Sequence, residues 1–388
     1  MHLILAHITV SMIYGVISPY LPIMLRLLGY RAAVIGILFA IAEGVGITGP
    51  FLFSRLADRS GNYRRTIIFS FALTTAAAVP LSIFIQPIAS ALLIAVFTIG
   101  HRAAVPLIDA ITSINLGEKG NYGKIRVYGS VSYVCFILFL QWVPVLQPDT
   151  PLNISLWILF AGALAMGASF LMPSKYANVK FDQKNTNSGP CGKEEKQKGT
   201  LWTPIFILGL ACIALSRMAM ASIYSFFPLF MIEYMNWNAV GPMLALASIA
   251  EIPFILLSKR IIRRFGTMPL LAFTSAMVAL RLGLYAVFPY KGSIIIAQLL
   301  HCFTFGLFHP AAIAFISNNV PPEKRSFGMT LYMSVGSGLP IFIGNFIGGF
   351  IIDSAGYRAL FGSFTAFAIL GAAIYVIYRL KEASVKRA

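Results

Sequence analysis

Three acidic side chains lie inside long apolar runs of the sequence. They are Glu43, Asp109 and Glu251, and the rest of the thirteen acidic residues lie in or beside polar segments. Burial disfavours the charged form of a carboxyl, so such a group can bind a proton while enclosed and release it when it meets water. Proton binding is therefore the expected chemistry, and all three carboxyls are candidates for it. For Glu43 and Asp109, an ion pair with a neighbouring helix is the alternative.

Three arginines, Arg102, Arg217 and Arg281, also lie inside apolar runs. A guanidinium fork can bind a carboxylate through two parallel hydrogen bonds, which suits a small organic acid as ligand. The alternative is an ion pair with Glu43 or Glu251 that neutralises charge. A purely structural role is an alternative for Arg102 in particular.

Two histidines, His301 and His309, are eight residues apart in one apolar run. That spacing is close to two helical turns, so both imidazoles are expected on one helix face, directed toward the protein interior. His7, near the start of the first apolar run, is instead expected at the boundary between lipid and water.

The scaffold that holds these side chains is predicted to be an all-α integral membrane protein. Of 388 residues, 58% are hydrophobic and 11% charged, and the mean hydropathy of +0.80 is too high for a water-soluble fold. Spanning a bilayer takes roughly 20 apolar residues in a helix. Twelve such runs lie near 3–28, 32–54, 66–86, 88–115, 127–147, 153–173, 204–231, 239–258, 268–288, 293–317, 328–352 and 358–379. They predict twelve transmembrane helices.

One long polar segment, 174–203, divides the runs into two sets of six. We expect six-helix bundles at 1–173 and 204–388, the second with a short cytoplasmic tail, joined by a cytoplasmic linker. Residues 36–61 align with 241–266 without a gap at an offset of 205, which indicates two pseudo-symmetric repeats. In this alignment Glu251 falls opposite Gly46, one turn from Glu43, so both carboxyls are expected to face one cavity.

The distribution of basic residues predicts the orientation of the chain. Of 30 Lys and Arg residues, 23 lie in alternate interhelical segments and the tail, and four lie in the other loops. Cytoplasmic loops keep such residues, so both termini are expected in the cytoplasm of a cell, with the protein in the inner membrane.

Other classes of protein are disfavoured. The net charge of +17 is spread over short segments, so no nucleic-acid surface is expected. Four scattered cysteines predict neither a disulfide framework nor a metal site, and the absence of a phosphate-binding GxxxxGK[ST] motif argues against ATP-driven chemistry. No cofactor is expected, and an enzyme is disfavoured because no nucleophile and base are suitably spaced. A membrane sensor remains an alternative, although the longest loop is too short for a signalling domain.

The loop after the second apolar run, SRLADRSGNYRR at 54–65, resembles the G-x-x-x-D-R-x-G-R-R signature of the major facilitator superfamily. In that superfamily the acidic and basic cluster latches the cytoplasmic ends of neighbouring helices. The resemblance implies a latch here, with Ser54 in place of the first Gly and the terminal basic pair displaced to Arg64 and Arg65. The latch residues it implies are Asp58, Arg59, Gly61 and Arg64. The alternative is a solvated loop charge.

A closer resemblance, over nearly the whole chain, is to the phenylpropionate permease family and, more distantly, to the lactose permease group of oligosaccharide and proton symporters. It rests on residues 122–131 (YGKIRVYGSV), Ala250 to Ile252, Arg281, and 298–302 (QLLHC) followed by His309. The lactose group implies substrate roles for Asp109, Arg126 and an aromatic at Tyr133. It implies proton coupling for Glu251, Arg281 and His301. Departures from these families include Thr304, Ala314 and Leu282, where an acidic residue, an Arg and a Trp can stand.

Together these features predict a proton-coupled secondary transporter of a small organic solute. A phenylpropionate-like aromatic monocarboxylate is the expected solute, and a sugar or nucleoside is the alternative. Glu43 is added to the proton-coupling residues, and Arg217 and His309 to the substrate-binding ones. The expected partners are the solute, protons and the lipid bilayer, and the chain is expected to be monomeric.

Overall fold

A computed structural model describes residues 1–116, 122–143, 147–173, 202–321 and 324–385, and within them the chain is helical with short connections. The α-helices and π-helices (η) are, in chain order, α1 (His2–Leu27), α2 (Ala32–Gly46), α3 (Thr48–Ser60), α4 (Tyr63–Ile83), α5 (Pro87–Leu116), α6 (Tyr122–Trp142), α7 (Pro151–Phe170), α9 (Pro204–Leu229), η3 (Phe230–Tyr234), α10 (Val240–Phe265), α11 (Thr267–Val287), α12 (Lys291–Leu299), η4 (Cys302–Leu307), α13 (Phe308–Asn319), α14 (Arg325–Leu331), η6 (Tyr332–Gly338) and α15 (Leu339–Val385).

The described residues contain eleven continuous helical stretches that are long and apolar enough to cross a membrane. The last, Phe327–Tyr378, has 52 residues and is interrupted at Gly356, where φ is 79° and ψ is −179°. A right-handed helix cannot continue through that conformation, so this stretch makes two spans. The structure therefore confirms the predicted fold class of twelve transmembrane helices.

Two of these helices are longer than the sequence predicts. The second and eighth spans continue past the predicted ends at 54 and 258, to Ser60 and Phe265. Each continues through its basic segment until a glycine with positive φ, Gly61 at 64° and Gly266 at 80°. Glycine tolerates this conformation, which closes a helix. These two glycines are the residues that the offset of 205 pairs.

Local capping begins other helices. The hydroxyl of Thr150 accepts a hydrogen bond from the backbone N–H of Asn153 at the start of α7, and Thr203 does the same for Phe206 at the start of α9. A proline follows each threonine at the first helical position, where no backbone donor is needed.

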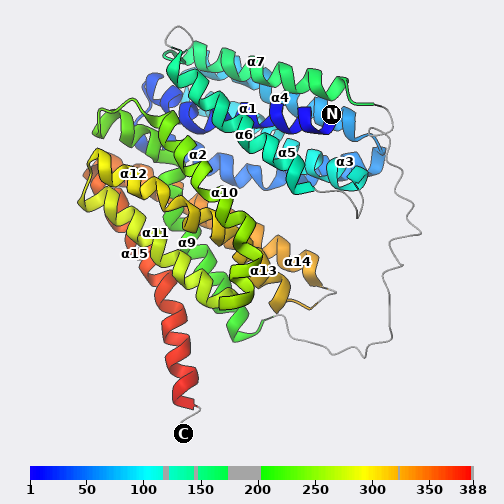
Figure 1. The fold of residues 1–388 in the computed structure, drawn as a ribbon. Helices are drawn as coiled ribbons and strands as arrows, with labels where there is room; N and C mark the ends of the chain where they lie inside the picture. The colour runs from blue at the N-terminus through cyan, green and yellow to red at the C-terminus, as the bar shows by residue number, and fades with distance from the viewer. Residues whose placement is uncertain (117–121, 144–146, 174–201, 322–323, 386–388) are drawn as a thin grey trace, which may run out of the picture.

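The helices form two groups, α1 to α7 and α9 to α15 (Figure 1). Within the first group, α4 packs on α5 and α7, and α1 packs on α6; within the second, α15 packs on α9 and α11. The groups meet where α2 packs on α15, α6 on α10 and α1 on α9. The predicted linker lies outside the described residues except for Trp202 and Thr203. We call the groups the first half and the second half.

Glycines permit the closest contacts between the halves. A Cβ atom on Gly36 of α2 would overlap the backbone carbonyl of Asn345, and one on Gly349 of α15 would overlap that of Ala32. At the other interface, a Cβ on Gly241 would lie 3.1 Å from the Ile137 carbonyl of α6. Gly36 and Gly241 are paired by the repeat offset, so the same position brings each half against the other.

Successive helices run in opposite directions, which gives the molecule two ends. We name the basic end by its helix ends near 55–65, 122–126, 258–268 and 324–327, which carry most of the described Lys and Arg residues. The opposite end comprises the connections near 27–32, 83–87, 142–151, 234–240, 287–291 and 353–358.

Candidate functional site

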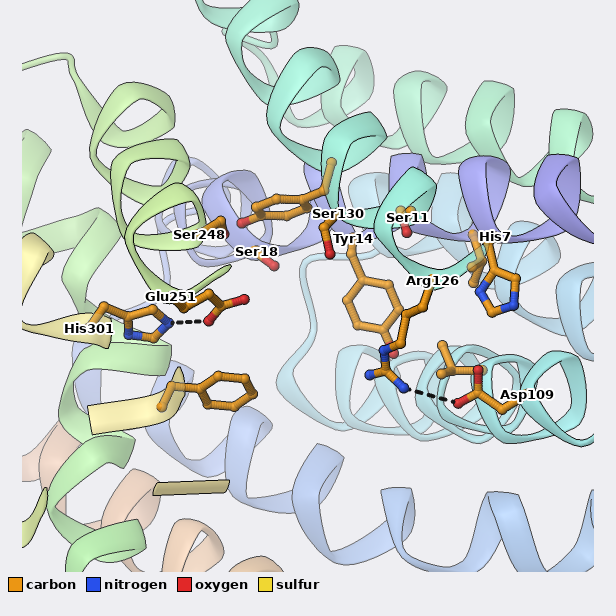
Figure 2. A pocket seen from close by; sticks show the side chains of 15 residues that line it. His7, Ser11, Tyr14, Ser18, Asp109, Arg126, Ser130, Ser248, Glu251 and His301 are labelled. Carbon is orange, nitrogen blue, oxygen red and sulfur yellow. Dashed lines mark ion pairs between the residues drawn. The ribbon is translucent and has the colours of Figure 1, made fainter. Parts of the chain in front are cut away.

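A cavity of about 410 Å³ lies between the two halves (Figure 2). Helices α1, α5 and α6 line it from the first half, and α10 with the segment from His301 to Phe305 lines it from the second. The lining includes six hydroxyl side chains: Ser11, Tyr14, Ser18, Ser130, Tyr133 and Ser248. Its charged or titratable residues are His7, Asp109, Arg126, Glu251 and His301. A small solute with several polar groups fits such a site.

One wall of the cavity carries a chain of three side chains from the second half. His301 Nε2 lies 3.3 Å from Glu251 Oε2, and Arg281 NH1 lies 2.8 Å from His301 Nδ1. A guanidinium has only donors, so Nδ1 must accept and the ring proton must sit on Nε2, directed at Glu251. A second proton on His301 would displace Arg281. The arrangement leaves Glu251 as the group in this chain that can accept a proton.

Arg281 is fixed by further hydrogen bonds and is 1% exposed. It donates to Thr304 Oγ1 at 3.0 Å and to Gln298 Oε1 at 2.8 Å, and Gln298 donates in turn to the Tyr285 hydroxyl at 3.2 Å. Thr304 occupies the position where the lactose group carries an acidic residue, and here it accepts a bond from Arg281. The guanidinium therefore has one orientation, which holds the His301 ring in place.

The backbone of η4 brings Glu251 to His301. Gly306 of η4 packs against α10, and a Cβ there would lie 3.0 Å from the Glu251 carbonyl oxygen and 3.1 Å from its Cβ. A π-helical turn breaks the regular helix just after His301. Such turns occur often at functional sites because they redirect side chains.

Across the cavity, Arg126 NH1 lies 3.5 Å from Asp109 Oδ2, and Tyr133 stands two turns along α6 from Arg126. All three residues line the cavity. His7 lies beside them, 5% exposed, with Nε2 3.1 Å from the Thr112 hydroxyl. The expectation that His7 lies at the membrane boundary was wrong, because this helix start packs into the bundle and does not face lipid.

Glu43 does not line this cavity with Glu251. Its carboxylate binds the Arg102 guanidinium of α5, which is the ion pair considered as an alternative. Gly46, one turn further along α2, leaves room for Arg102, since a Cβ there would lie 3.4 Å from the arginine Nε. The pair joins α2 to α5 within the first half.

Arg217 and His309 lie in a second polar cluster behind Phe305. Arg217 donates to the hydroxyls of Tyr224 at 3.2 Å and Tyr332 at 3.3 Å, and His309 Nδ1 is 3.0 Å from the Tyr332 hydroxyl. The Phe305 ring stacks between the rings of His301 and His309, at centroid distances of 5.5 and 5.6 Å. The two histidines thus share one face, and Phe305 separates them.

The residues of the implied latch make local contacts at the basic end. The Tyr63 hydroxyl donates to Asp58, and Arg64 donates to the backbone carbonyl of Met172 at the end of α7, at 3.0 Å. Gly61 ends α3 with positive φ. These contacts stay within the first half.

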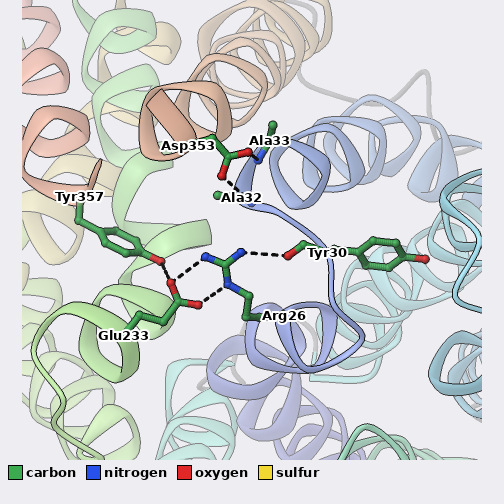
Figure 3. Close-up of polar contacts among 7 residues, drawn as sticks. All are labelled: Arg26, Tyr30, Ala32, Ala33, Glu233, Asp353 and Tyr357. Carbon is green, nitrogen blue, oxygen red and sulfur yellow. Dashed lines mark hydrogen bonds and ion pairs between the residues drawn. The ribbon is translucent and has the colours of Figure 1, made fainter. Parts of the chain in front are cut away.

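Polar contacts join the halves at the opposite end (Figure 3). Arg26 at the end of α1 forms a two-pronged ion pair with Glu233 of η3, one prong being NH2 to Oε2 at 2.8 Å. The Tyr357 hydroxyl donates to the same Oε2 at 2.6 Å. Nearby, Gln141 of α6 donates to Asn238 at 3.2 Å.

A second contact at this end uses a helix terminus. Asp353 accepts hydrogen bonds from the backbone N–H groups of Ala32 and Ala33 at the start of α2, both at 3.1 Å (Figure 3). Free N–H groups and the partial positive charge of a helix start favour a carboxylate there. Arg31 lies 3.5 Å from the same carboxylate.

Sequence reasoning did not single out several of these residues. Glu233 and Asp353 each fall just past the predicted end of a span. The feature that could have pointed to them is the presence of Arg26 and Arg31 in loops with few other charges, where each arginine needs an acidic partner. The hydroxyls and Phe305 have no such signal, because serine, tyrosine and phenylalanine are common on packed helix faces.

Twelve spans in two halves, a polar cavity between them and closure at one end define a secondary transporter of the membrane. A family model described as the MFS_1 like family matches residues 8–363. The chain belongs to this family, and is thus a multi-pass transporter of the major facilitator superfamily and not an enzyme.

Two relatives are similar in sequence. A probable 3-phenylpropionic acid transporter of Escherichia coli (strain K12) is 26% identical over 372 residues, which cover 92% of both chains. A maltose permease of Geobacillus stearothermophilus is 24% identical over 286 residues, covering 73% of this chain and 69% of that one.

Solved structures share the fold. A mutant of the nucleoside transporter NupG superposes with a TM-score of 0.81 at 13% identity, covering 97% of this chain and 98% of that one. The xylose transporter XylE from E. coli, in an inward open conformation, gives 0.69 at 11% identity, covering 96% and 94%. At these identities the similarity concerns the fold.

Proposed function

We propose that the protein is a proton-coupled symporter that carries a small aromatic monocarboxylate by alternating access. The observation that carries this proposal is the chain from Arg281 through His301 to Glu251 on the cavity wall. Glu251 is the proton carrier, and Arg281 and His301 hold it in position. Asp109, Arg126 and Tyr133 form the opposite wall, along which the solute passes.

In this proposal the halves, residues 1–173 and 204–388, rock about the cavity, joined by a linker at 174–203. The basic end faces the cytoplasm of a cell, because loops rich in Lys and Arg stay on the cytoplasmic side of a membrane. Both termini lie on that side of the inner membrane. The structure then corresponds to closure at the outer end. Asp58, Arg59, Gly61 and Arg64 act as a latch when the basic end closes. The transporter works as a monomer.

The choice of solute rests on the phenylpropionic acid transporter among the relatives and on the buried arginines, which suit a carboxylate. A sugar or nucleoside is the second candidate. The hydroxyl-rich cavity lining favours it, as do the maltose permease and the nucleoside transporter among the similar proteins.

The first prediction tests proton coupling in vesicles that contain the purified full chain. Glu251→Gln is expected to abolish accumulation of 3-phenylpropionate driven by a pH gradient, while exchange of labelled for unlabelled solute persists, because Gln cannot release a proton. Asp149→Asn is the matched control, since Asp149 accepts a hydrogen bond from Asn153 in a connection outside the cavity. Full accumulation by Glu251→Gln would refute the assignment.

Testing maltose and a nucleoside in the same assay decides the solute class. Uptake of one of these without uptake of 3-phenylpropionate would replace the monocarboxylate by the second candidate. A failure of the wild-type protein to transport any of the three would mean that the solute belongs to another class of small molecule.

A further inference from the structure

The arginines inside the membrane spans differ in how their charge is neutralised. Three have a carboxylate oxygen within 4.0 Å: Arg26 with Glu233, Arg102 with Glu43 and Arg126 with Asp109. Arg281 connects to Glu251 through His301. Arg217 has no Asp or Glu within that distance among the described residues. The buried charge of Arg217 therefore has no acidic neighbour within the part of the chain that the structure describes.

The surroundings of Arg217 are those of a buried group. Its exposed fraction is 7%, and its Nε has no hydrogen-bond partner among the residues described. Its two terminal nitrogens donate to the hydroxyls of Tyr224 and Tyr332. A hydroxyl that accepts from a guanidinium keeps its own proton, so the Tyr224 hydroxyl can also donate a hydrogen bond, while that of Tyr332 lies 3.0 Å from His309 Nδ1.

Aromatic rings provide only part of the missing compensation. The guanidinium carbon lies 4.9 Å from the Phe308 ring centroid and 5.9 Å from that of Phe305. Attraction between a cation and a ring is weaker than the loss of hydration on burial. A carboxylate that bound here would supply the remainder, since a charge-assisted pair with Arg is among the strongest hydrogen-bonded contacts.

Arg217 lies directly behind the cavity. Tyr224, bonded to Arg217, is 37% exposed. Phe305 lines the cavity with one part of its surface and lies over Arg217 with another. Phe305 is thus the side chain that separates the cavity from Arg217.

We infer that Arg217, Tyr224, Tyr332 and His309 form an anion subsite that binds the carboxylate of the transported solute. The inference rests on the proposed function and refines it: Arg217, and not the already paired Arg126, selects for a negative charge. A solute with one carboxylate matches this one buried guanidinium. The subsite also sets that carboxylate on the second half, near Glu251, so that solute and proton are held by the same rigid body.

The test compares two ligands that differ in charge and hardly in shape, 3-phenylpropionate and 3-phenylpropionamide. Binding to the purified full-length protein is measured by calorimetry at one pH. The wild type is expected to bind the carboxylate at least about tenfold more tightly than the amide. Arg217→Gln is expected to bind both equally. Arg358→Gln is the matched control and keeps the preference, because Arg358 bonds to the Ala286 carbonyl within its own half.

A second measurement needs no ligand. Removing an uncompensated buried charge is expected to raise the thermal unfolding midpoint of ligand-free Arg217→Gln above that of the wild type. Arg26→Gln, which breaks an ion pair, is expected to lower it. If Arg217→Gln does not fold, Tyr332→Phe and Tyr224→Phe are used, and each is expected to reduce the preference for the carboxylate several-fold.

Two results would overturn the subsite: an unchanged carboxylate preference in Arg217→Gln, or stabilisation of the wild type by chloride alone and not by 3-phenylpropionate. A different result would refute the proposed function without refuting the subsite. If Glu251→Gln still accumulates solute while Arg217→Gln loses the preference, the proton carrier is wrong and the subsite stands.

Discussion

At the scale of single residues, the position of one hydrogen atom decides how the cavity wall works. Arg281 can only donate, so the His301 ring presents its own N–H to Glu251. A carboxylate accepts such a bond more strongly than a neutral carboxyl does, because hydrogen bonds to charged groups are the stronger ones. Protonation of Glu251 therefore weakens its bond to His301.

This orientation gives a prediction for two substitutions of His301. The Gln amide can place a donor where Nε2 lies, and the Asn amide can place an acceptor where Nδ1 lies. His301→Gln is expected to keep proton-driven accumulation within about threefold of the wild type. His301→Asn is expected to lose about tenfold or more, the equivalent of one hydrogen bond to a charged group.

Initial rates of uptake in vesicles, with and without a pH gradient, give the measurement. The reverse order, with Asn better than Gln, would mean that contact with Arg281 and not donation to Glu251 is what coupling needs.

At the scale of elements, close packing of η4 against α10 sets the distance between Glu251 and His301. Gly306 leaves just enough room for the Glu251 backbone, as Gly36 and Gly349 do for the crossing of α2 and α15. The three π-helical segments among the described residues all lie in the second half and carry Glu233, Phe305 and Tyr332. Each segment places a side chain that makes a long-range contact.

Gly306→Ala tests this packing. The added methyl group would push α10 away from η4 by a few tenths of an ångström and lengthen the contact between Glu251 and His301. Proton-driven uptake is expected to fall about tenfold, because a lost charge-assisted bond is worth roughly 1.5 kcal/mol.

Gly283→Ala is the control, since a Cβ at Gly283 meets nothing within 4 Å. That change is expected to leave uptake unaltered and to stabilise α11 by about 0.5–1 kcal/mol. Equal uptake by the two variants would show that the packing of Gly306 does not position Glu251.

At the scale of the whole molecule, the polar contacts described between the halves lie at one end. Arg26 with Glu233, Gln141 with Asn238, and Asp353 with the start of α2 all join the halves at the opposite end. The cavity between them is lined by residues toward the basic end, including Arg126 and Asp109. Opening the closed end requires these contacts to separate together.

Arg26→Gln is expected to favour opening at the closed end. The pair is partly exposed, so its loss shifts the equilibrium by about 1 kcal/mol, or about fivefold. The measurement is the rate at which a membrane-impermeant maleimide, added from that side, labels a cysteine introduced at Ser18, which lines the cavity. The native cysteines are first replaced by serine.

Arg358→Gln serves as the comparison, because its guanidinium bonds within the second half. Its labelling rate is expected to match that of the unchanged background. A faster rate in both variants would indicate a general loosening of this end and not the loss of one contact.

The sequence predicted the fold well because long apolar runs and loop charges carry the membrane constraint directly. Hydropathy did not predict the helix ends at Ser60 and Phe265, because a helix can continue past the hydrocarbon until a glycine ends it. Charges inside apolar runs, together with family resemblance, led to Asp109, Arg126, Glu251 and His301, which the structure places around one cavity.

Contacts between residues far apart in the chain could not be predicted from the sequence. The contact between Arg26 and Glu233 joins residues 207 positions apart, and neither residue lies in a pattern that names its partner. For Glu43, the sequence left two alternatives open, a place in the cavity or an ion pair. The repeat alignment favoured the cavity, whereas in the structure α2 is rotated so that the carboxyl faces Arg102 of α5.

Asp353 has a consequence for how this protein tolerates variation. Its carboxylate binds backbone N–H groups of Ala32 and Ala33, and every residue except proline supplies that group. Substitutions at those two positions therefore leave the donors intact, provided the new side chain fits. Among these three positions, the two hydrogen bonds are therefore sensitive to a change of charge at Asp353 alone.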